Sequence, residues 1–589
     1  MFDKIIAYSV KNKFVIGLFV AALIVWGVFS LRQLPIDAVP DITNNQVQII
    51  TISPTLATQE VEQFITTPVE LAVQSLQKTE EIRSISRFGL SVVTVVFQEG
   101  YDIYLARQLV NEKLQEAEED IPNGLGTPEM APLSTGLGEI FQYVVRPEQG
   151  YDDKYSPTEL RSIQDWIVTR QLLGIEGIAE VNSMGGFLKQ YEVAIDPSKL
   201  KSLNISITDV FSALAKSNEN TGGAYIEKNS SAYYIRSEGL AKSLSDIENI
   251  VVSDQGNIPL LVKDVANVGY GKAPRYGALV RDGKEVVGGK VMMFKGANSA
   301  QVTELVKERV VQIQKSLPEG VVIEPYLVRD KLVSTAISTV TTNLIEGGLI
   351  VIFILVLLLG NWRAGLVVAS VIPLAMLFAI SMMNVLGISA NLMSLGAIDF
   401  GLIVDGAVII VEAIVHRLQN NKAGLSLTQK QMDDEVITSS QKIRSSAAFG
   451  EIIILLVYIP ILALVGIEGK MFKPMAETVM LAIAGALILS LTYVPMMAAL
   501  VLNKNVVNKK TFADRIIAFF QRLYTPILNV ALRFKALFVA ATFIIFLASL
   551  FGFSRMGGEF IPTLEEGDLA MQHILPPGSS LSQSVETAK

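Results

Sequence analysis

Residues 398–412 read IDFGLIVDGAVIIVE, which places three carboxylates, Asp399, Asp405 and Glu412, in an otherwise apolar run. On one continuous helix, Asp405 and Glu412 lie about 20° apart around the axis, and Asp399 lies about 120° from Asp405. The three acids then extend over about 20 Å, which is most of the hydrocarbon thickness of a bilayer. The stretch therefore predicts a membrane-spanning helix that carries acids at several depths.

Acids at such depths require a functional or structural explanation, because placing a carboxylate at the centre of a bilayer costs about 2.5–3.5 kcal/mol of insertion free energy. We interpret Asp399, Asp405 and Glu412 as a proton relay, in which desolvation lets protonation alternate during a cycle. The alternatives are an ion pair with a basic residue on another span, and Glu412 reaching the membrane interface. Three glycines punctuate the same predicted helix: Gly396, Gly401 and Gly406. They favour either a close neighbouring helix or conformational freedom.

The composition of the whole chain is typical of a membrane protein. Of its 589 residues 50% are hydrophobic and 18% charged, whereas soluble domains are about 25% charged. The net charge of −8 provides no basic field for nucleic acid. The lack of cysteine excludes thiolate zinc sites, iron–sulfur clusters and cysteine nucleophiles. No GxxxxGKS or GxxxxGKT motif is present, so we expect no cofactor and no ATP-driven pump with its own nucleotide site.

Apolar runs predict seven spans, each near the ~20 residues that a bilayer requires. They cover residues 14–31, 341–360, 365–386, 391–416, 447–467, 478–503 and 536–554. Basic residues cluster before the first run, after the fourth and after the sixth. This distribution places the N-terminus in the cytoplasm and the long segment between the first two runs outside. Residues 512–532 mix apolar and basic side chains at helical spacing and predict an amphipathic helix on the cytoplasmic face.

The outer segment, residues 33–329, shows strand and helix patterns. Strand, helix, two strands and a helix are predicted at 47–52, 58–76, 81–86, 91–97 and 103–117. That order is typical of a split-βαβ, ferredoxin-like unit. A second unit is predicted from 139–173 and 285–325, around a β-rich insert at 179–270. The fold class is therefore an α+β membrane protein, with a helical transmembrane bundle and a large outer region of ferredoxin-like subdomains.

Part of this pattern recurs near the end of the chain. Residues 13–40 and 535–562, offset by 522, both run from a lysine through a charge-free span to a proline. Residues 58–62 and 582–586 are similar at an offset of 524. Chance similarity between two hydrophobic helices is the alternative. A true repeat predicts the first half of a duplicated protein, followed by the opening of its second half.

Other candidates give weaker signals. Glu346 and Glu451 are expected near span ends, at the membrane interface. Met571 and His573 lie close in sequence to acids at positions 565, 566 and 568. Metal ligation at these two residues is one interpretation, and a loop surface is the other.

Over its whole length the chain resembles the resistance–nodulation–division (RND) transporters. The shared order is one helix, a long outer insert, a helical block and then a repeat of the opening pattern. Within these transporters the chain is most similar to the heavy-metal efflux branch, of cobalt–zinc–cadmium type. The resemblance rests on QLPIDAVPDIT at 33–43, GLGTPEMAPLSTG at 124–136 and, above all, residues 399–412. Multidrug members typically have two adjacent aspartates in the fourth span, whereas Gly406 follows Asp405 here. Copper and silver relatives usually lack the acid that matches Asp399.

The resemblance implies a homotrimeric, multi-pass pump of the bacterial inner membrane, with a large periplasmic region. It implies export of divalent cations such as zinc, cobalt, cadmium or nickel in exchange for protons. Its partners would be a periplasmic adaptor (membrane fusion) protein and an outer-membrane channel, with no nucleic acid. Asp399, Asp405 and Glu412 match the family's proton and cation relay positions. Ala413 departs from the asparagine that commonly follows the glutamate, and family members are nearly twice as long.

The resemblance also divides the chain. It implies a first transmembrane helix at 1–32, a periplasmic porter subdomain at 33–135, and a second at 136–178 and 271–330 around a docking subdomain at 179–270. Transmembrane helices 2–6 would occupy 331–504, the amphipathic helix 505–534, helix 7 residues 535–556, and a truncated second porter region 557–589. Two other functions stay open: multidrug or lipid export on the same scaffold, and a non-transporting remnant.

Overall fold

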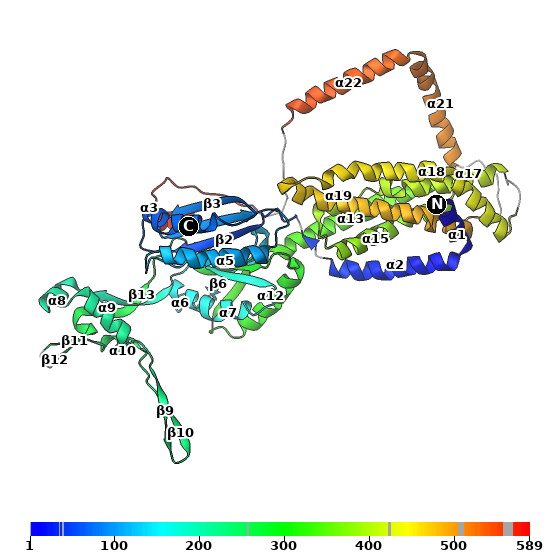
Figure 1. The fold of residues 1–589 in the computed structure, drawn as a ribbon. Coiled ribbons are helices and arrows are strands. Elements are labelled where there is room, and N and C mark those ends of the chain that lie inside the picture. Colours follow the sequence, from blue (N-terminus) through cyan, green and yellow to red (C-terminus); the bar gives the residue numbers. More distant parts are fainter. Residues whose placement is uncertain are drawn as a thin grey trace. The chain divides into compact units, whose positions relative to one another are not determined.

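The computed structural model describes residues 2–34, 36–37, 40–255, 258–421, 426–504, 512–557 and 569–589. The chain forms two compact units, whose helices and strands are labelled in Figure 1. The first contains Met1–Gly138, Phe294–Gln301 and Arg329–Met571. The second contains Glu139–Met293, Val302–Val328 and Gln572–Lys589.

Long apolar helices dominate the first unit. Within the described residues, five are long and apolar enough to cross a membrane: α2 (Lys13–Gln33), α13 (Arg329–Leu359), Trp362–Leu386 (α14, Trp362–Ala369, with α15, Val371–Leu386), α19 (Gly466–Leu491) and α22 (Lys535–Arg555). A sixth is α18 (Gln429–Leu462), if its two parts, bent by 46° between Ile443 and Ala448, form one span. Each of these helices overlaps one of six predicted spans, although α19 begins and ends earlier than the run predicted at 478–503, and α18 begins earlier than the run predicted at 447–467. The seventh prediction, residues 391–416, falls on α16 (Leu392–Gly396) and α17 (Phe400–Asn421), which is not among the helices of that kind.

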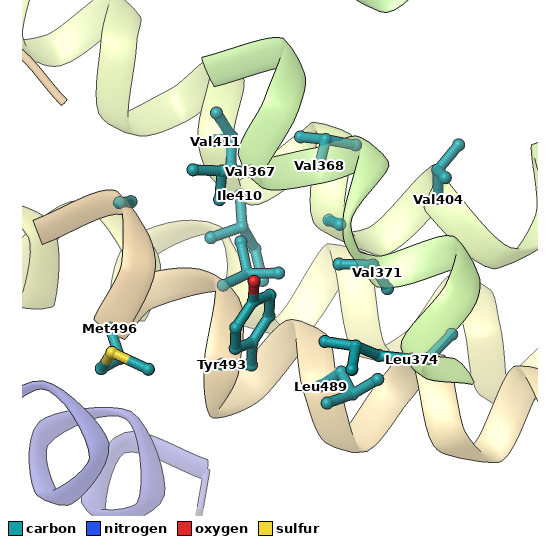
Figure 2. Close-up of a cluster of buried hydrophobic side chains, with 14 of the residues drawn as sticks. Val367, Val368, Val371, Leu374, Val404, Ile410, Val411, Leu489, Tyr493 and Met496 are labelled. Atoms are coloured by element: carbon teal, nitrogen blue, oxygen red, sulfur yellow. The ribbon is translucent and has the colours of Figure 1, made fainter. Parts of the chain in front are cut away.

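The helices pack around one apolar core. Figure 2 shows side chains from α14 and α15 interleaved with others from α17, α19 and α20 (Tyr493–Val501): Val367, Val368, Val371, Leu374, Val404, Ile410, Val411, Leu489, Tyr493 and Met496. The Tyr493 hydroxyl, the main polar group in this cluster, lies 2.9 Å from Ser370 Oγ, so its burial leaves no orphan hydroxyl. By contrast, no described residue of α22 is buried.

The first unit also holds a four-stranded antiparallel sheet in the order β3-β4-β2-β5. Its strands are β2 (Gln46–Ile52), β3 (Thr79–Arg87), β4 (Leu90–Phe97) and β5 (Glu129–Met130). The helices between them in sequence are α3 (Thr58–Val61), α4 (Thr67–Val73) and α5 (Ile103–Asp120). Alternation along β2 buries Val47 and Ile49 against valines of α4 and α5. The predicted elements are confirmed in type and order, although the helix predicted at 58–76 has a π-helical turn, Glu62–Thr66, and ends at Val73.

A second sheet of the same kind forms the second unit, in the order β14-β15-β6-β16, with β7 also paired to β15. Its strands are β6 (Glu139–Pro147), β7 (Ile178–Met184), β14 (Leu279–Arg281), β15 (Lys284–Met293) and β16 (Val321–Val328). Helices α6 (Pro157–Ile163) and α7 (Thr169–Leu172) lie between β6 and β7 in sequence. The predicted β-rich insert is present, with β8 (Lys189–Ile195) paired to β13 (Ala266–Lys272) and a hairpin of β9 (Gly222–Lys228) and β10 (Ser231–Arg236).

Helix boundaries agree with the predicted repeat. Helix α2 runs from Lys13 to Gln33 and α22 from Lys535 to Arg555, so both contain 21 residues and both ends are offset by 522. The helices before them, α1 (Phe2–Lys11) and α21 (Phe512–Arg533), also end at positions offset by 522. Helix α21 confirms the helix predicted at 512–532. Positions 559 and 562, which the repeat matches to Asp37 and Pro40, lie outside the described residues.

Candidate functional site

Helix α17 separates apolar and acidic side chains around its circumference. Ile403, Ala407, Ile410 and Ile414 are buried in the helical core. The exposed positions follow a second stripe: Gly401, Asp405, Glu412 and His416. At 100° per residue this stripe occupies a sector of about 60°. The prediction that Asp405 and Glu412 share one face of a helix is therefore confirmed, and that face is uncovered by the described residues.

Asp399 lies outside this helix, which corrects the expectation of one continuous helix from residue 391. Helix α16 ends at Gly396 and α17 begins at Phe400. The Asp399 carboxylate accepts a hydrogen bond from the Gly401 N–H at 2.8 Å. The helix is interrupted between Gly396 and Phe400, where the Asp399 carboxylate satisfies a free N–H at the start of α17. The 120° separation from Asp405 and the 20 Å extent do not apply to Asp399.

Asp399 instead lines a cavity of about 400 Å³ between α13 and the start of α17. The α13 side of this cavity includes Asn343, Gly347 and Val351. A carboxylate beside an amide in a cavity of this size has room for water, which would hydrate the charged acid. Within the described ranges no basic side chain forms an ion pair with Asp399, Asp405 or Glu412. The alternative of a structural ion pair therefore finds no support in that part of the chain.

Sequence reasoning misjudged Glu451. It was expected at the membrane interface, but its side chain is only 1% exposed, on α18 facing α17. The burial was missed because it depends on the packing of α18 against Gly406 of α17. Glu346, on α13, is exposed, and its place near a span end stays a prediction. An acid flanked by apolar residues, in FGEIII, was the signal that could have identified Glu451.

The three glycines have different surroundings. A Cβ atom at position 406 would lie 2.7 Å from Glu451 Cδ, so Gly406 permits the close approach of α18. A Cβ at Gly401 would meet only the Asp399 carboxylate, at 3.1 Å. Gly396 belongs to α16 and not to α17, and a Cβ there would have no described atom within 4 Å, so its role in helix packing stays a prediction.

Two ion pairs tie α18 to its neighbours. Lys13 of α2 lies 2.7 Å from the Asp433 carboxylate, and Arg417 of α17 lies 2.8 Å from that of Glu435. Both pairs are mostly covered from solvent, which favours stronger interactions than surface pairs make. They fix one end of α18 against α2 and α17.

The candidate metal ligands near the end of the chain are not brought into a site. Met571 is 91% exposed, and His573 is exposed as well. The acids at 565, 566 and 568 lie outside the described residues, so metal ligation there stays a prediction. In the ranges that the structure covers, no group of three or more histidines and acids is placed to hold a metal ion.

Comparison with known proteins agrees with this architecture. The sequence model of the AcrB/AcrD/AcrF family matches residues 5–589. The chain is 46% identical to the cobalt-zinc-cadmium resistance protein CzcA of Cupriavidus metallidurans, over 100% of this chain and 56% of that protein. It is 40% identical to the nickel-cobalt-cadmium resistance protein NccA of Alcaligenes xylosoxydans xylosoxydans, over 99% and 57%.

A solved structure extends the likeness to three dimensions. The crystal structure of a heavy metal efflux pump superimposes with a TM-score of 0.85 at 31% identity, over 99% of this chain and 55% of that one. The fold of the described chain is therefore that of such a pump over the shared part. The chain spans a little more than half the length of each of these relatives.

Proposed function

Because the chain belongs to the AcrB/AcrD/AcrF family, of RND type, we propose that the protein exports divalent heavy-metal cations and is driven by the proton gradient. The observation that carries this proposal is the pair of carboxylates, Asp405 and Glu412, on the uncovered face of α17. The names of CzcA and NccA, which state resistance to cobalt, zinc, cadmium and nickel, support that class of cargo.

The proposed mechanism uses the cost of charge at bilayer depth. An ionised Asp405 is unfavourable in an apolar surrounding and favourable in a hydrated one, so uptake or loss of a proton changes which arrangement of α17 is preferred. The opposite face of α17 is packed against α14, α15 and α19, so a shift of α17 is passed to the bundle. Proton movement would thereby drive alternating access of a metal path.

We infer the remaining features from the family and the chain together. The basic residues after the predicted spans support a cytoplasmic N-terminus in the bacterial inner membrane, with both sheets in the periplasm. The strand orders of the two sheets support ferredoxin-like porter subdomains, and the insert at 179–270 would be the docking subdomain. A homotrimer that binds an adaptor protein and an outer-membrane channel completes this proposal. In a protein of the relatives' length, a second helical block would cover the acidic face of α17.

A tolerance panel tests the proposal. A Gram-negative host without its own metal efflux receives the gene, with any coding sequence beyond Lys589, and its adaptor and channel. We expect growth in zinc, cobalt, cadmium or nickel, no protection from copper, silver or dyes, and loss of protection in Asp405→Asn. The control Asp434→Asn makes the same change at an exposed position of α18.

Each other outcome rejects a part of the proposal. Protection from dyes alone would favour multidrug export. Protection that survives Asp405→Asn would remove the acid from the mechanism. No protection from any compound, with the protein present in the membrane, would favour a non-transporting remnant.

A further inference from the structure

We propose that Glu451 exchanges a proton with Asp405, so that α17 and α18 together form the proton-carrying unit. This inference rests on the proposed proton-driven transport and adds a residue to it. In the exchange, the O–H bond of the Glu451 carboxyl breaks and an O–H bond forms on the Asp405 carboxylate, or the reverse. The pair keeps one proton and one negative charge throughout.

The Glu451 carboxyl is buried without a basic partner. Both oxygens of the Glu451 carboxyl are inaccessible to solvent, no described side chain pairs with them, and the Gly406 N–H is the polar group beside them. Two other acids of the same helix behave differently, since Asp433 is paired with Lys13 and Glu435 with Arg417. An ionised carboxylate in such surroundings is costly unless it is neutralised or paired. Glu451 therefore has the environment of a group that holds a proton.

Glu451 also contacts α17. The Glu451 carboxyl lies over Gly406, the residue that follows Asp405, at a place where a Cβ atom would overlap it. Only a glycine lets a carboxyl from α18 reach the backbone of α17 there. The packing of two helices, and not a mobile loop, therefore holds the Glu451 carboxyl against the residue that follows Asp405.

The charge near Glu451 comes from another acid. Among the described groups, Asp405 is the charged residue that acts electrostatically on Glu451. The other helices packed on α18 also carry charged residues, none of which acts on Glu451: Asp3, Lys4 and Lys11 on α1, and Glu468, Lys470, Lys473 and Glu477 on α19. Two neighbouring carboxylates resist being ionised together, and they release their protons as a coupled pair. Loss of the proton from one acid therefore favours its retention by the other.

This coupling gives α18 a function in the cycle. When Asp405 takes the proton, Glu451 must become charged inside the bundle, which is costly because the carboxylate is shielded from water. The cost is removed when Glu451 recovers a proton or when α18 moves toward a hydrated position. Proton transfer and movement of α18 against α17 are thereby linked.

Infrared spectroscopy of the purified full-length protein tests the pair without requiring transport. We expect Glu451→Gln to remove a C=O band of a protonated carboxyl that persists at neutral pH, and Asp405→Asn to change the pH dependence of that band. Glu346→Gln, the same substitution at an exposed acid of α13, should leave the band unchanged. A spectrum of Glu451→Gln identical to that of the wild type, or a band insensitive to Asp405→Asn, would overturn the proposal.

Proteoliposomes with an internal pH dye test the role in transport, with zinc, cobalt, cadmium and nickel supplied one at a time. Glu451→Gln removes one of the two carboxyls from the proposed pair, so we expect the pH of half-maximal metal-dependent proton flux to be lower than in the wild type. Glu451→Asp, which keeps an acid, should retain a profile closer to that of the wild type even if the glutamine variant folds poorly. An unchanged profile in Glu451→Gln would show a structural role only. The wild type could move no protons while Asp405→Asn still changes the pH dependence of the Glu451 band. That result would reject the proposed function and keep the proposed pairing of Glu451 with Asp405.

Discussion

The side-chain nitrogen of Lys470, near the start of α19, lies 2.6 Å from the Glu99 carboxylate and 2.7 Å from the Thr43 carbonyl oxygen. Glu99 follows strand β4 and Thr43 precedes β2, so one lysine joins a membrane helix to two central strands of the first sheet. The lysine side chain is largely covered, which protects these interactions from screening. Movement of α19 should therefore be passed to the sheet through Lys470.

Substitution of Lys470 by methionine tests this connection. It removes the charge but keeps most of the apolar stem, and it should reduce metal export more strongly than stability. Because Glu99 is half exposed, we expect its ion pair to contribute only about 0.2–1 kcal/mol to the free energy of unfolding. The measurements are metal uptake into inverted vesicles and thermal unfolding in detergent. Equal transport in Lys470→Met and in the exposed control Lys442→Met would reject the coupling role.

A double-mutant cycle with Glu99→Gln separates the two partners of Lys470. If the ion pair transmits the movement, the double variant should transport no worse than either single variant. Additive losses would assign the effect to the Thr43 carbonyl or to each residue separately.

The two substitutions at Asp399 should give different results. Asp399→Asn retains an oxygen that can accept the Gly401 N–H, so we expect little change in stability but a loss of metal tolerance if the charge is required. Asp399→Ala also removes the cap of α17 and should cost about 0.5–2 kcal/mol. Thermal unfolding and the tolerance panel measure the two effects. Equal stability of both variants would show that the cap contributes nothing.

The sequence predicted element types well where one periodicity dominates. Alternation in residues 46–52 and the run at 90–97 determine their strands, because one face of each strand is buried. It failed at residues 391–400, since Asn391 and Asp399 can each begin a helix and apolar content alone does not reveal the break between them. It failed at Glu451 because the burial of an acid depends on the partner helix, and only the packing of α18 on Gly406 shows it.

The second unit should lose stability in acid through Glu324. Arg146 donates a hydrogen bond to the Glu324 carboxylate at 2.7 Å, and Arg281 contacts its other oxygen, so these guanidinium groups lower the pKa of Glu324. A lowered pKa means that the stabilisation is present above the pKa of the unfolded chain, about 4.3, and is lost as pH falls through the lower folded value. We expect the melting temperature of Glu324→Gln to lie below that of the wild type at pH 7 and to approach it as the pH falls below the pKa of the unfolded chain, about 4.3. A difference that does not depend on pH would attribute the effect to packing.

Gly406 and Gly396 form a matched pair of helix glycines. Alanine at 406 would place a methyl group against the Glu451 carboxyl, and such overpacking typically costs about 1–3 kcal/mol. Alanine at 396 meets no described atom within 4 Å, so we expect no loss of stability there. Thermal unfolding in one detergent compares the two variants, and Glu451→Ala should restore stability to Gly406→Ala because the shorter side chain removes the overlap. Equal melting temperatures for Gly406→Ala and Gly396→Ala would contradict the close contact of α17 and α18, and with it the placement of the Glu451 carboxyl against Gly406.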